Sequence, residues 1–248
     1  MDISEKKDFG AFLVFGGVMG FVGVLGALSD IGLSSVLGGA DISALPRDAV
    51  GRFASFHADP LVGLYQLDLL NVCMALVSLP FFLALGLAHR RSRPAFALFA
   101  VTMTAVGTTV FVAGNAALPM LGLAGKYYAA ADGPGRQVIA AAGEALLSRG
   151  AHGSPGAFPG FILSSISSLV FSILMRGGGV FGRGVGLLGI AGSSILILYL
   201  IVVTFMPGTE HVAMYIAMVG GLATMAWLVT ASIRLIGLGV GPATTQTR

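Results

Sequence analysis

Six long runs of apolar residues dominate the pattern of this chain, separated by short basic links or by longer polar connections. The hydrocarbon core of a bilayer is about 30 Å thick, and a helix advances about 1.5 Å per residue, so a span needs roughly 20 residues. Each run comes near that length. The pattern therefore predicts six membrane-spanning helices, over residues 9–28, 61–88, 95–118, 158–175, 185–206 and 212–235.

Two connections are long enough to hold structure of their own. In residues 30–60, Pro46 and Asp48 precede apolar positions at helical spacing. In residues 119–157, a Gly-Pro turn precedes a helix over about 136–148, whose expected apolar face is formed by Val138, Ile139, Ala142, Ala145 and Leu146. The predicted fold is thus an all-α, polytopic transmembrane helix bundle, a single domain over 1–248, with two amphipathic interfacial helices in the long outer loops.

Positive charges predict the orientation of the bundle. The link between the second and third runs contains three arginines, and loops rich in Lys and Arg stay on the cytoplasmic side. We therefore expect both termini to be cytoplasmic and the two long connections to lie outside. The residues behind this prediction are Lys6, Lys7, Arg90, Arg91, Arg93, Arg176, Arg183, Arg234 and Arg248. The basic start and the small residues Ala27 and Ser29 after the first run would also suit a signal peptide.

Composition narrows the class of protein. Hydrophobic residues make up 56% of the 248 positions and charged residues only 10%, whereas soluble domains carry about 25% charged residues. The net charge of +3 does not indicate nucleic-acid binding, because Arg and Lys flank apolar runs as membrane anchors do. The single cysteine, Cys73, excludes an internal disulfide and a cysteine-based metal site. The expected partners are the lipid bilayer and, for a subunit, another membrane protein or complex.

Small residues within the runs favour helix packing over ligand binding. Residues 184–189 satisfy the G-x-G-x-x-G pattern, but that pattern cradles a pyrophosphate only between a strand and a helix, and here it opens a membrane span. The close-approach spacing recurs on one face of the first run, at Gly16, Gly20, Gly23 and Ala27. Hydroxyl stripes at Thr104 and Thr108, and at serines from Ser164 to Ser172, are likewise favoured as packing contacts. No cofactor is expected.

One acid lies well inside an apolar run. Asp68 falls about two turns into the second predicted span, with Tyr65 and Asn71 three residues away on its helical face, and Asn115 closes the third run. A carboxylate at this depth would relay protons, bind a cation or recognise a polar substrate; equally, it would be neutral and hydrogen-bonded to a neighbouring helix. Asp68, Asn71 and Asn115 form the candidate polar intramembrane site.

The outer connections contain a second set of polar candidates. Tyr127, Tyr128 and Glu144 stand there without an obvious folding requirement. Three histidines also fall on the predicted outer side, namely His57, His152 and His211. No pair of them has a recognised metal-ligand spacing, so solvated interfacial histidines are favoured over a metal site. No catalytic motif of the HExxH or Ser/Cys–His kind occurs.

The stretch NAALPMLGLAGKYYAAADGPGRQVIAAAGEALL at 115–147, with LYQLDLL at 64–70 and GLLGIAG at 186–192, resembles a family of small bacterial integral-membrane proteins. This uncharacterised six-helix family is known only as a domain of unknown function. The resemblance implies six spans and a bacterial plasma membrane, but no substrate, cofactor or catalytic residue. The chain departs from the family pattern at Gly133–Gly135, where polar or acidic residues are usual, and at Asp68, where Ser or Thr is usual.

Three classes of function remain open from the sequence. The favoured class is a non-enzymatic accessory, scaffold or assembly subunit, because intramembrane polarity is sparse. The second is a small transporter or channel with Asp68 in a polar path. The third is an outer-face metal-binding sensor or enzyme that uses the histidines and Glu144.

Overall fold

The computed structural model describes residues 3–37, 45–177 and 179–241, and every regular element in these ranges is an α-helix. Six of these helices are long and apolar enough to cross a membrane, which confirms the predicted fold class. The elements are α1 Ile3–Val36, α2 Ala49–Ala58, α3 Pro60–Tyr65, α4 Leu69–His89, α5 Pro94–Gly114, α6 Ala117–Ala129, α7 Gly133–Gly150, α8 Phe158–Arg176, α9 Arg183–Phe205 and α10 Glu210–Val240.

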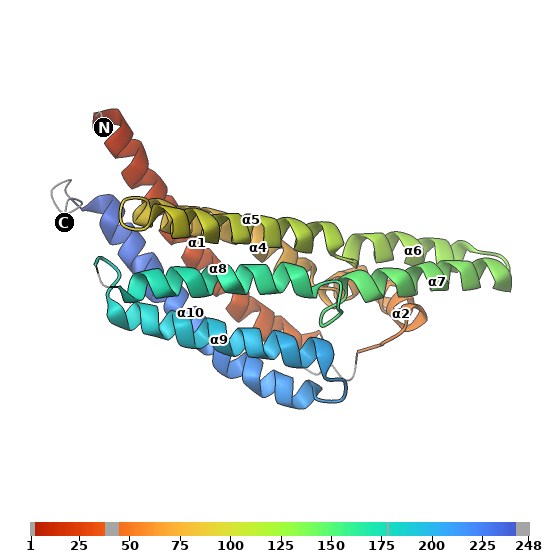
Figure 1. Ribbon diagram of the computed structural model, residues 1–248. Coiled ribbons are helices and arrows are strands. Elements are labelled where there is room, and N and C mark those ends of the chain that lie inside the picture. The colour runs from red at the N-terminus through yellow and green to blue at the C-terminus, as the bar shows by residue number, and fades with distance from the viewer. Residues whose placement is uncertain (1–2, 38–44, 178, 242–248) are drawn as a thin grey trace.

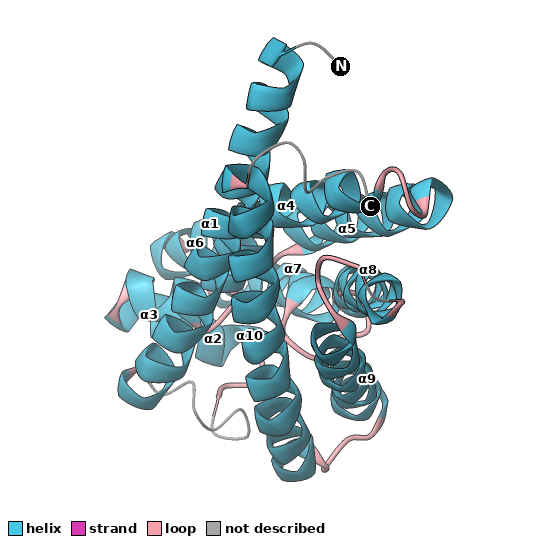
Figure 2. Cartoon of the chain, turned by 90° about the vertical axis from the view of Figure 1, so that its left-hand side faces the viewer, coloured by secondary structure: helices cyan, strands magenta, loops and turns pink. Residues whose placement is uncertain are grey.

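The six long helices form a closed ring. Each packs on the next in the order α1, α4, α5, α8, α9, α10, and α10 returns to α1 (Figure 1). Figure 2 shows α8 and α9 nearly end-on while α1 and α10 cross the view at a steep tilt. Both tilted helices exceed the roughly 20 residues that a perpendicular span requires, with 34 and 31 residues, and tilt accommodates such excess length.

Aromatic side chains fill the middle of the ring. Phe81 and Phe82 of α4 meet Trp227 of α10, with ring centroids 5.7 and 6.5 Å apart, and Phe82 also faces Phe171 of α8 at 6.1 Å. Phe81, Phe171 and Trp227 are almost completely buried, as is Leu13 of α1. Large rigid rings of this kind bury much surface at low conformational cost. They join α4 to α10 and to α8, helices that are not direct neighbours in the ring.

Glycines set how closely the helices approach, and the close contacts predicted from the spacing are present at Gly16 and Gly20 but not at Gly23. A Cβ at Gly16 would collide with α4 at Ala84 and the Pro80 carbonyl, and one at Gly189 would collide with Ser172 and Trp227. Gly23, by contrast, has nothing within 4 Å of its Cβ position. Gly186, Gly189 and Gly192 therefore belong to helix contacts between α8, α9 and α10, whereas Gly184 has nothing within 4 Å of its Cβ position.

The hydroxyl stripes also serve packing. Thr104 of α5 donates a hydrogen bond to Ser167 of α8 at 2.6 Å, and Ser167 donates to the Ala100 carbonyl at 2.7 Å. Ser168 and Ser172 donate back to carbonyls of their own helix. These hydroxyls donate their hydrogen bonds between or along helices, as hydroxyls that serve packing do.

Four shorter helices pack together beyond one end of the ring, and we call α2, α3, α6 and α7 the head (Figure 1). Their core contains Phe53, Phe56, Leu67, Met120 and Leu147, all buried. The helices α5 and α6 together form one apolar stretch of 36 residues. At 1.5 Å per residue this is about 54 Å, well beyond a bilayer core of about 30 Å, so α6 projects from the membrane if α5 spans it.

The predicted apolar face of α7 is partly wrong. Val138, at 71% exposure, points away from the head core together with Ala142 and Ala145, whereas Gly143, Leu147 and Gly150 are buried. Gly143 fits against Ala49 and Phe53 of α2, and a Cβ at Gly150 would collide with the Gly114 carbonyl. Helical periodicity is read from apolar side chains, but the closest packing of α7 is made by two glycines, which have no side chain.

Candidate functional site

The second predicted span begins later than the apolar run suggested. Residues 60–65 form α3, a helix of the head, and α4 starts only at Leu69. Asp59 caps α3 by accepting hydrogen bonds from the backbone amides of Leu61 and Val62, so a new helix of the head begins at this point. Asp68 stands at the break between the two helices rather than two turns inside a span.

Asp68 has an unusual backbone. Its φ is 64° and its ψ 23°, the left-handed region, and it is the one non-glycine residue with positive φ in the described part of the chain. Asp and Asn tolerate this conformation better than other residues with a Cβ. At this turn α3 ends and α4 begins, and the carboxylate of Asp68 reaches His152 in the α7–α8 link.

The carboxylate is held by two partners. Its Oδ2 accepts a hydrogen bond from His152 Nδ1 at 2.7 Å, and its Oδ1 accepts one from Asn71 Nδ2 at 3.1 Å. Burial raises the pKa of Asp68, but the His152 charge and the hydrogen bonds outweigh burial and hold the pKa below its usual value. The Asp68 carboxylate in turn raises the pKa of His152 well above its usual value. The two side chains form an ion pair near neutral pH.

His152 connects this ion pair to α9. Its Nε2 lies 2.5 Å from the Tyr199 hydroxyl oxygen, and Phe161 covers the ring at 5.7 Å between centroids. When the imidazole is protonated, Nε2–H donates to Tyr199; when it is neutral, the tyrosine hydroxyl donates instead. The side chains of Asp68 and His152 are 13% and 27% exposed, so water has limited access. The triad Asp68–His152–Tyr199 thus accepts two protonation states without losing its hydrogen bond to Tyr199.

A second carboxylate, that of Asp30 in α1, lies beside the triad. The hydroxyl oxygen of Tyr65 in α3 lies 3.0 Å from the Asp30 carboxylate and 3.0 Å from the Asp30 carbonyl, so the Tyr65 hydroxyl donates to α1. Burial and the nearby Asp30 charge raise the pKa of Tyr65, which keeps the phenol protonated and able to donate. This bond ties α3 to the far end of α1.

Arg52 of α2 completes the charged surroundings. Its guanidinium donates to the Gln66 carbonyl at 3.4 Å; burial lowers the pKa of Arg52, while the charge of Asp68 opposes that shift. Its Nε and the Gln66 Oε1 are buried atoms with no hydrogen-bond partner among the described residues. Buried polar groups normally have partners, so a water molecule or another polar group beside these two atoms would satisfy them.

Of the predicted intramembrane candidates, the structure brings all three to this region. Asn71 contacts Asp68 directly, and Asn115, at the α5–α6 junction, donates to the Leu67 carbonyl at 2.8 Å. Its side-chain oxygen accepts the Ala117 amide at 2.9 Å, which caps the start of α6. Asn115 therefore joins the α5–α6 junction to the α3–α4 break and holds the two in place relative to each other.

The predicted outer-face candidates lie in the head, away from the triad. Glu144 of α7 accepts the Ala49 amide at the start of α2 at 2.6 Å. Tyr127 packs on Phe53, and Tyr128 stacks on His57 with centroids 4.0 Å apart. These residues hold head helices together.

The three histidines do not meet. His57 lies in the head, His152 in the triad and His211 in the first turn of α10. Among the described residues, no three His, Cys, Asp or Glu side chains are grouped as metal ligands would be. This arrangement gives no support to the outer-face metal site. Sequence reasoning missed Asp30, Arg52 and Tyr199; Tyr199 carries a signal, as a tyrosine within an otherwise apolar run.

The chain has no match among family models, curated proteins or solved structures. The resemblance to a bacterial membrane family therefore stays a prediction. The function of the chain has to be inferred from its own geometry.

Proposed function

We propose that this chain is a non-enzymatic accessory or assembly subunit of a membrane complex, whose spanning bundle holds the head in a fixed orientation for a partner. The observation that supports it is the placement of the polar contacts. Asp68 lies between α3 and α4, Asn115 between α5 and α6, and His152 between α7 and α8. Within the described ranges, these are the three direct passages of the chain between head and bundle.

At each passage, a side chain reaches across to another passage or another helix. Asp68 binds His152, His152 binds Tyr199 of α9, and Asn115 binds the carbonyl beside Asp68. The Tyr65–Asp30 contact adds α1 to the set. Hydrogen-bonded networks of low exposure rigidify the elements that they join. These contacts thus restrain the three connections about which the head would otherwise rotate relative to the bundle.

The head also offers a surface for a partner. Leu61, Leu118 and Val138 are 73%, 62% and 71% exposed, on α3, α6 and α7. Exposed apolar side chains on a projecting element are typical of protein or lipid contact sites. A rigid head would present them without an ordering cost on binding.

The experiment compares the size of the complex in membranes of the cells that produce the chain. In mild detergent, the wild-type chain should migrate in native electrophoresis well above its own 25.3 kDa and bound detergent. The variant His152→Ala should retain the single-chain fold, checked by Trp227 fluorescence, but lose the larger species. Arg183→Gln, exposed on α9 away from the head, is the matched control and should retain it. A wild-type chain that migrates alone would contradict the proposal.

A second candidate, a small transporter, has one observation in its favour. Transporter sites often form where a spanning helix is interrupted, and the α3–α4 break places Asp68 beside Arg52 Nε and Gln66 Oε1, which have no partner among the described residues. Proteoliposomes containing the chain should then show ion- or proton-coupled flux that Asp68→Asn abolishes. Flux that persists in Asp68→Asn would exclude this role for the acid.

A further inference from the structure

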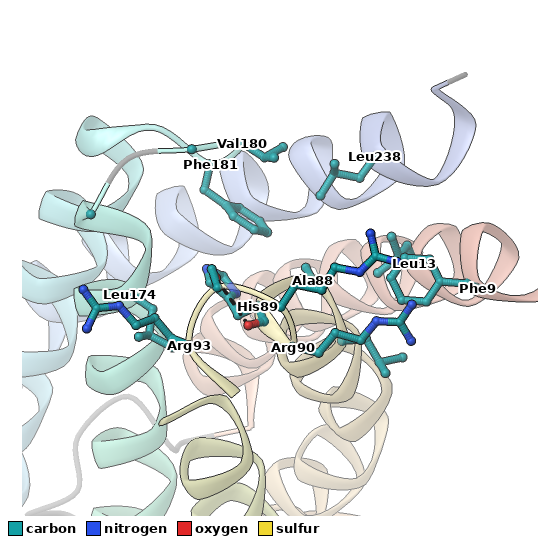
Figure 3. A pocket seen from close by; sticks show the side chains of 15 residues that line it. Phe9, Leu13, Ala88, His89, Arg90, Arg93, Leu174, Val180, Phe181 and Leu238 are labelled. Atoms are coloured by element: carbon teal, nitrogen blue, oxygen red, sulfur yellow. Dashed lines mark hydrogen bonds between the residues drawn. The ribbon is translucent and has the colours of Figure 1, made fainter. Parts of the chain in front are cut away.

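A cavity of about 340 Å³ opens at the end of the bundle opposite the head. We call this end, with the α4–α5 and α8–α9 links, the arginine end. Helices α1, α4, α8 and α10 and both links contribute to the wall of the cavity (Figure 3). None of the residues of the Asp68 site lines it.

One part of the cavity wall consists of aromatic rings and aliphatic side chains, and hydrogen bonding and ring stacking hold its histidine ring in place. His89, at the end of α4, is buried, its Nδ1 lies 2.9 Å from the Leu85 carbonyl, and its ring stacks on Phe181 at 5.1 Å with 12° between planes. Figure 3 shows Phe181 over His89, with Phe9 and Leu13 on the other side of the cavity. Leu238 of α10 closes this apolar side.

The other part is cationic. Arg90, Arg91 and Arg93 of the α4–α5 link all line the cavity, and none of the described lining residues is acidic. The Arg90 guanidinium lies 4.1 Å from the centre of the Phe9 ring, so one cation already rests on the apolar wall. Arg91 and Arg93 are exposed and form no ion pair with any described carboxylate.

The two parts together define the chemistry of an occupant. Guanidinium groups match phosphate oxygens in geometry and charge. Basic pockets between membrane helices bind the head groups of anionic lipids. A free phosphate ion would use the arginines but has no need of the wall formed by Phe9, Leu13 and Leu238.

We propose that this cavity binds one anionic phospholipid, with its phosphate against Arg91 and Arg93 and the beginning of an acyl chain against the apolar wall. The site would anchor the end of the bundle opposite the head to a lipid of defined charge. This inference does not depend on the proposed function of the head.

The test is native mass spectrometry of the full purified chain, titrated with phosphatidylglycerol or with phosphatidylcholine of the same acyl chains. We expect phosphatidylglycerol to bind about tenfold more tightly than phosphatidylcholine. The double variant Arg91→Gln/Arg93→Gln should lower phosphatidylglycerol affinity about tenfold and leave phosphatidylcholine unchanged. Ala88→Phe, which fills the cavity without changing charge, should lower phosphatidylglycerol affinity while the protein elutes from a sizing column as the wild type does.

Arg183→Gln/Arg234→Gln is the matched control, because both arginines are exposed, neither lines the cavity, and the loss of charge is the same. Its phosphatidylglycerol affinity should stay within about twofold of wild type. An equal loss in this control, or equal affinity of wild type for the two lipids, would overturn the proposal. Displacement of phosphatidylglycerol by millimolar inorganic phosphate would also overturn it, in favour of a free-anion site.

Discussion

Asp68 and His152, 84 positions apart in the chain, lie 2.7 Å apart between carboxylate and imidazole and join the α3–α4 break to the α7–α8 link. Both sit where the chain passes between head and bundle.

Removing one partner of this pair should destabilise the protein. His152→Gln leaves the Asp68 carboxylate without its cation in a site where that side chain is only 13% exposed. We expect a loss of roughly 2–3 kcal/mol, less than for a fully enclosed pair because His152 is 27% exposed. Trp227, the single tryptophan and almost completely buried, reports unfolding in detergent by its fluorescence. Arg183→Gln should match wild type, and an unchanged unfolding midpoint in His152→Gln would contradict the ion pair.

The same pair predicts a pH dependence of stability. The pKa of His152 is raised in the folded state, so its contribution is complete below its usual pKa near 6.5 and disappears as the pH rises through the raised value. The pKa of Asp68 is lowered, so its contribution is complete above its usual pKa near 3.8 and disappears as the pH falls through the lowered value.

The stability difference between wild type and His152→Gln should therefore be largest from about pH 4 to about pH 6.5 and shrink at either extreme. The measurement is the unfolding midpoint of both proteins across about pH 3 to about pH 10. A difference that stays constant over this range would show that the contact contributes by packing alone.

The left-handed backbone at Asp68 gives a separate prediction. Asp68→Ala and Asp68→Gly both remove the carboxylate, but only glycine adopts a φ of 64° without a steric cost. We expect Asp68→Gly to be about 1 kcal/mol more stable than Asp68→Ala. Unfolding of the two variants under one condition measures this difference directly, since the lost ion pair is common to both. Equal stability would mean that the turn relaxes.

Two glycines of α1 test the packing of the ring. Gly16→Ala places a methyl group against Ala84 and the Pro80 carbonyl, and overpacking of this kind costs about 1–3 kcal/mol. Gly23→Ala, about two turns further along the same helix, meets nothing within 4 Å and should leave stability unchanged or raise it by up to about 1 kcal/mol. If both substitutions have the same effect, α1 does not pack on α4 as described.

Much of the spanning architecture could be predicted from the sequence. The apolar runs of 158–175 and 185–206 correspond closely to α8 and α9, because a helix that crosses lipid must be apolar along its whole length. The glycine spacing in these runs also predicted close contacts. The single span predicted over 61–88 was wrong at its start. The run is apolar on both sides of Asp68, so its composition gave no reason to end one helix and begin another there.

The candidate site could be predicted only in part. Asp68, Asn71 and Asn115 were identified because polar residues are rare within apolar runs. Arg52 was not, since it is unremarkable in its own helix. Tyr199 stands out as a tyrosine in an apolar run, but its partner His152 is 47 positions away in the chain, and only folding brings the two together. The histidines were grouped as possible ligands by their side of the membrane, but the fold carries His57 and His211 away from His152.

Local composition and helical period are enough to establish that this chain is helical and apolar enough to cross a membrane six times, since both properties can be read along a single segment. Only the folded chain shows that four further helices of the described part pack into one head, and that Asp68, His152 and Tyr199 meet at its base. Local periodicity describes which face of a helix is apolar, and in α7 part of that face is exposed. It holds no information about which distant segment covers that face, because that depends on the closure of the ring and on the close contacts that glycine permits.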